Sequence, residues 1–243
     1  MTRVTMAEHN PGTEFDPDAG AIFGSVANGH APLRVSSAGD AAPPALQLLS
    51  NGRYQVMLGA AGTGYSHWNG LALTRWREDA TRDNWGAFCY LRAVASRRFW
   101  SCTRQPAPHE AGAYRSYFWD AGAVFDCHGE DIDSRLAVVV APDDDIEVRR
   151  LTLSNRALAQ QTIDVTSYAE VVLGAAAADD AHPAFSKLFV ESEILPQRHA
   201  ILCTRRSGSA AAAPWMFHLL VALDGAPAPV SYETDRMQFV GRG

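Results

Sequence analysis

Lysine is nearly absent from this chain of 243 residues: Lys187 is the single lysine, and the other cationic side chains are arginines. The 21 cationic residues are outnumbered by 27 acidic ones, which gives a formal net charge of -6. A nucleic-acid partner requires clustered positive charge that neutralises phosphates, so this balance argues against nucleic acid as a partner. We interpret the arginine excess as codon bias rather than as a functional feature.

Long hydrophobic runs are lacking too. Uncharged apolar stretches, such as residues 136–141, fall far short of the roughly 20 residues that a membrane-spanning helix needs. Residues 1–10 contain Arg3 and Glu8 and no apolar core of a signal peptide. We therefore expect a cytoplasmic domain.

The cysteines are few and scattered, without a C-x-x-C pair or a companion histidine at metal-binding spacing. We expect reduced, partly buried thiols and no metal site. The four residues are Cys89, Cys102, Cys127 and Cys203.

Sustained helical periodicity is missing, although 47% hydrophobic residues suffice for a packed core. The chain instead contains short runs rich in aromatic or β-branched residues, bounded by Gly, Pro, Asp or Asn. Asn51 and Gly52 separate two such runs and predict a hairpin, because both residue types tolerate positive φ. About a dozen runs at this spacing predict an all-β fold, an antiparallel sandwich.

The clearest meander comprises predicted strands over 132–140, 146–153 and 162–173. Further strands are expected at 71–76, 86–92, 99–103, 114–119, 123–127, 185–195, 200–206, 215–223 and 236–240. The alanine runs at 175–178 and 210–213 are interpreted as connections, because both lie beside loop residues.

Residues 1–44 hold several Gly, Pro, Asp and Asn residues without periodicity and predict a loosely ordered lead-in. The sandwich domain is expected over 45–243. Because the sequence stops directly after a predicted strand, without a polar tail, we expect the domain to be truncated at its C-terminal end.

The segment 74–86 combines arginines, carboxylates and indoles. Guanidinium groups pair with carboxylates, and flat apolar surfaces beside planar hydrogen-bonding groups suit a sugar. A salt-bridged loop that pins two sheets together explains the same residues, and both interpretations stay open. The candidate binding residues are Arg75, Arg77, Asp79, Arg82 and Trp85.

Two other segments carry weaker signals. Residues 59–66 are glycine-rich but lack the Lys-Ser/Thr of a phosphate-binding loop, so we interpret them as a β-connection. The segment from His182 to Lys187 is, from its residues alone, a mixed connection. No nucleophile motif is visible, and nothing assembles a complete active site.

Six segments, in the same order, closely resemble the N-terminal β-supersandwich of glycoside hydrolase family 94 phosphorylases. They are residues 48–54, 64–66, 74–86, 151–155, 166–171 and 182–189. The resemblance covers about residues 45–243 and is strongest to the phosphorylase-like region of cyclic β-1,2-glucan synthases.

This resemblance implies a parent enzyme that performs inverting phosphorolysis of β-glucosidic bonds. Inorganic phosphate, the co-substrate, attacks the anomeric carbon while one carboxylic acid protonates the leaving oxygen, which releases α-glucose 1-phosphate. In the family, the acid and the phosphate site lie on a C-terminal (α/α)6 barrel that this chain lacks. We therefore assign no catalytic residue, cofactor or metal here.

The resemblance further implies that the sandwich packs against the barrel and forms much of a homodimer. In relatives, the loop matching His182 to Lys187 reaches toward the acceptor side of the partner's cleft. Lys187 would lie where an arginine contacts sugar in cellobiose phosphorylases, flanked by His182 and Phe185. Ala184 occupies a position that is polar there, so a longer β-1,2-glucan oligosaccharide is the expected substrate. The segment from Arg75 to Trp85 is the second candidate for the surface that faces the substrate cleft.

The function implied is thus a carbohydrate-associated sandwich domain of a cyclic β-1,2-glucan synthase or β-glucan phosphorylase, inactive alone. The alternative is a freestanding carbohydrate-binding or dimerisation sandwich without catalysis. A mutarotase-like enzyme would need a His and a Glu inside a concave sheet, and no such pair is identifiable. The resemblance implies that the parent protein is attached to the inner membrane with this region in the cytoplasm.

Overall fold

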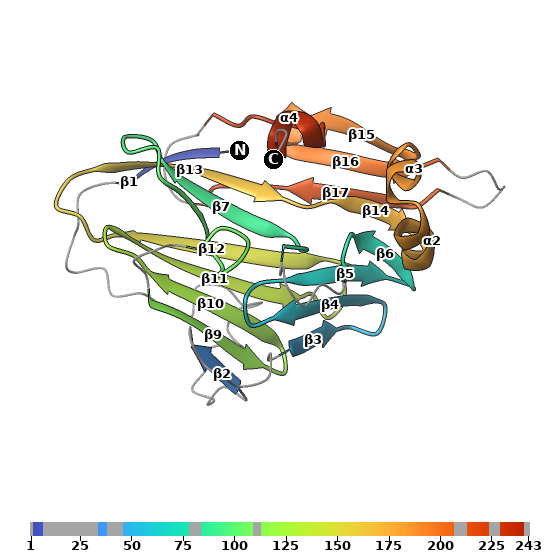
Figure 1. The fold of residues 1–243 in the computed structure, drawn as a ribbon, viewed down its shortest axis with the longest axis horizontal. Helices are drawn as coiled ribbons and strands as arrows, with labels where there is room; N and C mark the ends of the chain where they lie inside the picture. Colours follow the sequence, from blue (N-terminus) through green and yellow to red (C-terminus); the bar gives the residue numbers. More distant parts are fainter. Residues whose placement is uncertain are drawn as a thin grey trace.

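The computed structural model describes residues 2–6, 34–37, 46–77, 84–108, 113–206, 213–223 and 229–240. Within these ranges the chain forms four antiparallel sheets, and short turns join most of the consecutive strands. Figure 1 shows two of the sheets along the lower side of the view and two along the upper side. The predicted all-β, antiparallel sandwich is therefore confirmed.

The two lower sheets have five strands each. One has the order β12-β11-β10-β9-β2, and the other has the order β14-β6-β5-β4-β3. The strands of the first are β2 (Arg34–Ser37), β9 (Ala113–Trp119), β10 (Gly122–His128), β11 (Ile132–Val140) and β12 (Glu147–Asn155). Those of the second are β3 (Leu46–Ser50), β4 (Tyr54–Gly59), β5 (Gly64–Trp68), β6 (Leu71–Thr74) and β14 (Val171–Gly174).

The two upper sheets are smaller. A four-stranded sheet has the order β1-β13-β7-β8, and a three-stranded sheet has the order β15-β16-β17. Their strands are β1 (Thr2–Met6), β7 (Phe88–Ala93), β8 (Phe99–Ser101), β13 (Gln161–Tyr168), β15 (Val190–Leu195), β16 (Ala200–Arg205) and β17 (Trp215–Leu219). The structure thus adds two short strands, β1 and β2, within the predicted lead-in.

The main hydrophobic core lies between three of the sheets. Leu58 comes from β4, Leu91 from β7, Phe118 from β9 and Phe125 from β10, and each is at most 1% exposed. Alternation of inward and outward side chains along antiparallel strands produces this arrangement. The outward residues of β9, for example, are exposed or half-buried while Phe118 is fully enclosed.

Several sequence predictions hold at the level of single elements. The hairpin at Asn51 and Gly52 is confirmed as the turn between β3 and β4, with Gly52 at a φ of 93°. The β-connection predicted over 59–66 is confined to residues 60–63, between β4 and β5, and the rest of that segment belongs to the two strands. The strand predicted over 132–140 matches β11.

Four predictions of local structure are wrong. The expected strand over 162–173 is two strands in different sheets, β13 and β14, so the chain crosses from one sheet to another near Glu170. The alanine run at 175–178 lies largely within a helix, α2 (Ala176–Ala181), rather than in a connection. The strand expected over 185–195 begins only at β15, because its first residues belong to α3 (Pro183–Lys187). The strand expected over 236–240 is α4 (Arg236–Val240).

The helices are short: α2, α3 and α4 have six, five and five residues, and a 3-10 turn covers Pro196–Arg198. Isolated helices of this length are unstable in water, so tertiary contacts must hold them in place. Among the described residues, no helix is long and apolar enough to cross a membrane.

Candidate functional site

The two segments singled out in the sequence meet at one end of the molecule. Arg75 directly follows β6, and α2 and α3 follow β14, which is the strand paired with β6 at the edge of its sheet. In Figure 1 these two helices stand together at the right-hand end. Strand pairing therefore brings together residues that are about a hundred positions apart in the chain.

Arg75 lies at the centre of this end of the structure. Its Nε and Nη2 donate to the two carboxylate oxygens of Asp179, both at 2.6 Å. Nη1 donates to Glu170 Oε2 at 2.9 Å, and Nη2 also reaches the Pro183 carbonyl at 3.4 Å. The Arg75 side chain is only 3% exposed, so it acts as the support that holds α2 and the start of α3 against the sheet.

Glu170 forms ion pairs with three cationic side chains. Besides Arg75, its oxygens are 3.4 Å from Lys187 Nζ and 2.7 Å from Arg236 Nε. The Tyr168 hydroxyl donates to Glu170 Oε1 at 3.0 Å. Three cations, one just after β6, one in α3 and one in α4, thus face the carboxylates of Glu170 and Asp179, which leaves one positive charge in excess.

Both carboxyl groups are held in their ionised form. Burial opposes ionisation of Asp179, but hydrogen bonds from Arg75 and Ser186 outweigh it and lower its pKa. Burial likewise opposes ionisation of Glu170, but the hydrogen bond from Arg236 and the charge of Lys187 outweigh it and lower the pKa of Glu170. Neither group is suited to donate a proton near neutral pH, so this cluster is fit for binding and positioning rather than for acid catalysis.

The side chains that remain accessible lie on and beside α3. Lys187 is 40% exposed although its ammonium group reaches Glu170. Phe185 is 60% exposed, and its ring meets Phe189 edge to face at 5.0 Å. His182 is exposed at the junction of α2 and α3, where its carbonyl accepts from the Ser186 amide at 2.9 Å. An apolar ring and a cation therefore face solvent from one short helix.

Arg77 and Trp85 lie together beside this cluster. The Arg77 guanidinium carbon is 5.8 Å from the centre of the Trp85 ring, and Nε is 3.8 Å from Asp180 of α2. Nε and Nη2 of Arg77 are buried and find no hydrogen-bond partner within the described part of the chain. The other two candidates of this segment, Asp79 and Arg82, lie outside the described residues.

Sequence reasoning did not identify Glu170, Asp179 or Arg236 as members of the site. In the sequence, Glu170 falls on the polar face of the strand predicted over 162–173, and Arg236 falls in the strand predicted over 236–240. Two acidic residues after an alanine run were visible at 179–180, but no local signal shows that Asp179 pairs with Arg75. The described residues contain no group of three or more His, Cys, Asp or Glu side chains that could hold a metal ion.

Comparison with known proteins adds two findings. A family model described as the supersandwich domain of glycosyl hydrolase 94 matches residues 30–243. The chain is also 40% identical, over 199 residues, to the cyclic beta-(1,2)-glucan synthase NdvB of Rhizobium meliloti strain 1021. That alignment covers 81% of this chain but 7% of the synthase, so the chain spans a small part of the length of this relative.

Proposed function

Since the chain belongs to the glycosyl hydrolase 94 supersandwich family, we propose that it is the non-catalytic, carbohydrate-associated module of a β-1,2-glucan synthase or phosphorylase. The observation that carries this proposal is the ion-pair cluster around Arg75. It fixes α2 and α3 at the sheet edge and leaves Lys187 and Phe185 accessible on one helix.

The role proposed for the exposed residues is contact with a β-glucan oligosaccharide. A pyranose ring has an apolar face that packs on an aromatic ring such as Phe185, and its hydroxyl groups accept hydrogen bonds from an ammonium group such as that of Lys187. His182 and the Arg77–Trp85 pair would extend the same surface. Arg75, which is enclosed by its own partners, would act by positioning the helices.

The reaction of the whole protein is proposed to be inverting phosphorolysis that consumes inorganic phosphate and gives α-glucose 1-phosphate. The acid and the phosphate site would lie on a separate catalytic barrel, against which this module packs. Support comes from the family and from the lowered pKa values of Glu170 and Asp179, which leave this cluster without a proton donor. A homodimer that brings the α3 surface to the cleft of the partner, in the cytoplasm, completes the proposal.

The experiment measures release of glucose 1-phosphate from a β-1,2-glucan oligosaccharide and phosphate. We expect none from the 243-residue chain alone. In the parent protein, Lys187→Ala should raise KM for the oligosaccharide about fivefold with kcat unchanged, because one exposed hydrogen bond of about 1 kcal/mol to substrate is lost.

Arg206→Ala is the matched control. Arg206 is an exposed cation that pairs with Glu191 at 3.0 Å and belongs to neither candidate segment. Its loss should leave both kinetic constants unchanged. Turnover by the isolated chain, or an unchanged KM in the Lys187 variant, would contradict the proposal.

A further inference from the structure

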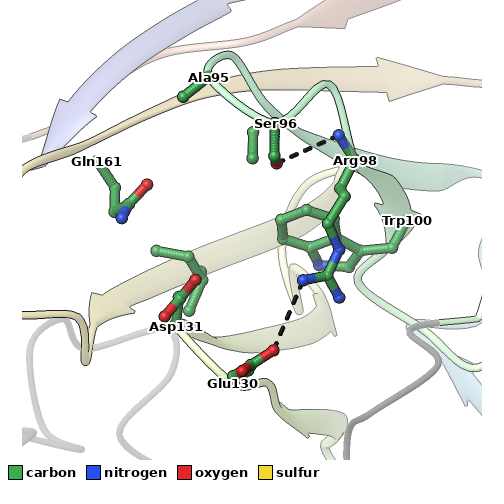
Figure 2. A pocket seen from close by; sticks show the side chains of 9 residues that line it. Ala95, Ser96, Arg98, Trp100, Glu130, Asp131 and Gln161 are labelled. Carbon is green, nitrogen blue, oxygen red and sulfur yellow. Dashed lines mark hydrogen bonds and ion pairs between the residues drawn. The ribbon is translucent and has the colours of Figure 1, made fainter.

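A depression lies at the end of the molecule opposite α2 and α3 (Figure 1). It is formed where the β7–β8 turn, the β10–β11 turn and the start of β13 meet, and it encloses about 210 Å³. Figure 2 shows the side chains that surround it. They are those of Ala93, Ala95, Ser96, Arg98, Trp100, Glu130, Asp131, Ile132 and Gln161.

This depression is separate from the α3 surface. Gln161 opens β13 and lines the depression, whereas Glu170 follows two residues after the end of that strand and lies in the ion-pair cluster. A strand rises about 3.3 Å per residue, so the two positions are roughly 30 Å apart along the chain direction. A single sugar unit bound at one place therefore does not touch the other.

The floor of the depression is apolar. Trp100 and Ile132 are each 5% exposed and belong to the main hydrophobic core, against which Ala93 also packs. These side chains are fixed by the packing of the three sheets, so the floor is preformed. Small-molecule sites typically combine such an apolar floor with a few polar groups of fixed direction.

The rim is polar, and its turns are held by backbone hydrogen bonds. The Ala93 amide donates to the Arg98 carbonyl at 2.9 Å, and the Val94 amide donates to the Thr162 carbonyl at 3.0 Å. On the opposite side, the Arg156 amide donates to the Asp131 carbonyl at 2.7 Å. The side chains on these turns thus project from rigid backbone, which keeps their hydrogen-bonding groups in place for a ligand.

Charge and size restrict the ligand. Arg98 is 3.7 Å from Glu130, and Asp131 adds a second carboxylate, so the rim does not favour a phosphate or another anion. The volume exceeds that of a cavity of about 150 Å³, which is enough to bind benzene, so the depression has room for one six-membered ring but not for a nucleotide.

Arg98 and Glu130 are well exposed, with side chains 48% and 70% accessible, so their ion pair contributes little and is easily opened. A neutral six-membered ring with many hydroxyl groups fits the apolar floor, the mixed charges of the rim and the volume of the depression. Its hydroxyls would bond to the carboxylates, the guanidinium and the Gln161 amide, and its apolar ring face would pack on the floor.

We propose that this depression is a second saccharide-binding subsite, which takes one neutral hexopyranose unit of a glucan. A binding module with two separated subsites holds a long chain more tightly than either subsite alone, because the second contact is made within the same complex. The subsite does not depend on Lys187 or on the function proposed for the α3 surface.

The test uses the 243-residue chain labelled with nitrogen-15 and follows the indole N–H signal of Trp100. The probe is a linear β-1,2-linked gluco-oligosaccharide, and inorganic phosphate is the second probe. At saturating concentration, we expect the oligosaccharide to shift the Trp100 signal by the same amount in the wild type and in Lys187→Ala, and we expect phosphate to leave the signal unchanged.

Ala95→Phe should weaken the oligosaccharide effect at least tenfold, because Ala95 is exposed on the rim and a phenyl ring there fills the depression. Ala159→Phe is the control, since Ala159 is also exposed, on the β12–β13 turn, but does not line the depression. Asp131→Ala and Gln161→Ala should each weaken the effect about threefold, and they decide the matter if Ala95→Phe does not fold.

Three results would overturn the subsite outright, and a fourth would assign the effect elsewhere. One is an unshifted Trp100 signal at saturating oligosaccharide. Another is an affinity in the folded blocking or rim variants that equals that of the wild type. The third is a shift of the same size with phosphate alone. Loss of the Trp100 shift in Lys187→Ala would instead assign the effect to the α3 surface, which also refutes a separate subsite.

Discussion

Replacing Arg75 by methionine tests whether the ion-pair cluster holds α2 and α3 in place. Methionine keeps an unbranched apolar stem of similar length and removes the guanidinium group. The change leaves Asp179, whose side chain is 4% exposed, without the two 2.6 Å hydrogen bonds that balance its charge. Glu170 keeps Lys187 and Arg236 as partners.

The cost follows from burial. Removing one partner of a buried ion pair typically destabilises a protein by about 3–5 kcal/mol, because an uncompensated charge remains inside. Arg75 and Asp179 meet this condition, so we expect Arg75→Met to lower the free energy of unfolding by about 3 kcal/mol or more at pH 7. The exposed pair of Arg206 and Glu191 serves as the control, and Arg206→Met should cost less than about 1 kcal/mol.

The pH dependence gives a second measure of the same effect. In the wild type the pKa of Asp179 is lowered, so its contribution to stability is present above the ordinary carboxyl pKa of about 4 and is lost as pH falls through the lower folded value. In the variant, burial without a cation raises that pKa. Protonation then relieves the penalty, and the difference between variant and wild type should shrink as pH falls from 7 to about 4.

A double-mutant cycle compares the urea unfolding of four proteins. They are the wild type, Arg75→Met, Asp179→Asn and the double variant Arg75→Met/Asp179→Asn. We expect a coupling free energy of roughly 2–3 kcal/mol between the two side chains. A coupling below about 0.5 kcal/mol, or a cost of Arg75→Met that does not change with pH, would refute the view that this pair fixes the helices.

Two further predictions concern other parts of the fold. Gly62→Ala should lower the free energy of unfolding by at least about 2 kcal/mol in a urea titration, because φ is 97° and the new Cβ would lie 2.3 Å from Thr103 Cβ. Gly52→Ala is the matched control, since its φ is similar at 93° with nothing within 4 Å, and an equal cost at both positions would contradict the clash. Burial lowers the pKa of His218, so the unfolded chain binds its proton more readily, and wild-type stability should fall as pH drops below about 6.5. His218→Asn should reduce that slope, and an unchanged slope would show that His218 is not its source.

The strands were predictable because their signal is local. In β11, buried and half-buried positions alternate over residues 132–136 and a continuous apolar run follows at 136–140, and the sequence predicts the bounds of the strand correctly. The hairpin at Asn51 and Gly52 was equally readable, since the requirement for positive φ is met by the residues of the turn itself. Turn chemistry and side-chain alternation act over a few residues, and so they can be read without knowing the rest of the molecule.

The helices and the site were less predictable because distant residues determine them. Nothing within 236–240 distinguishes a strand from a helix, and α4 is fixed by the contact of Arg236 with Glu170 and by the stacking of Phe239 on Tyr168 at 5.0 Å. The break between β13 and β14 likewise follows from the crossing between sheets. Of the residues in the ion-pair cluster, the sequence identified Arg75 and Lys187 as candidates, but it could not show that both pair with Glu170.

The sequence alone determined the class of fold, most of the strands, the resemblance to a family and two of the segments that form the candidate site. Tertiary structure decided which of these residues meet, which are enclosed and which remain accessible. The physical reason is that pairing of β6 with β14 brings Arg75 and Asp179 together across about a hundred residues of chain, and charge pairing over such a separation leaves no pattern in either segment.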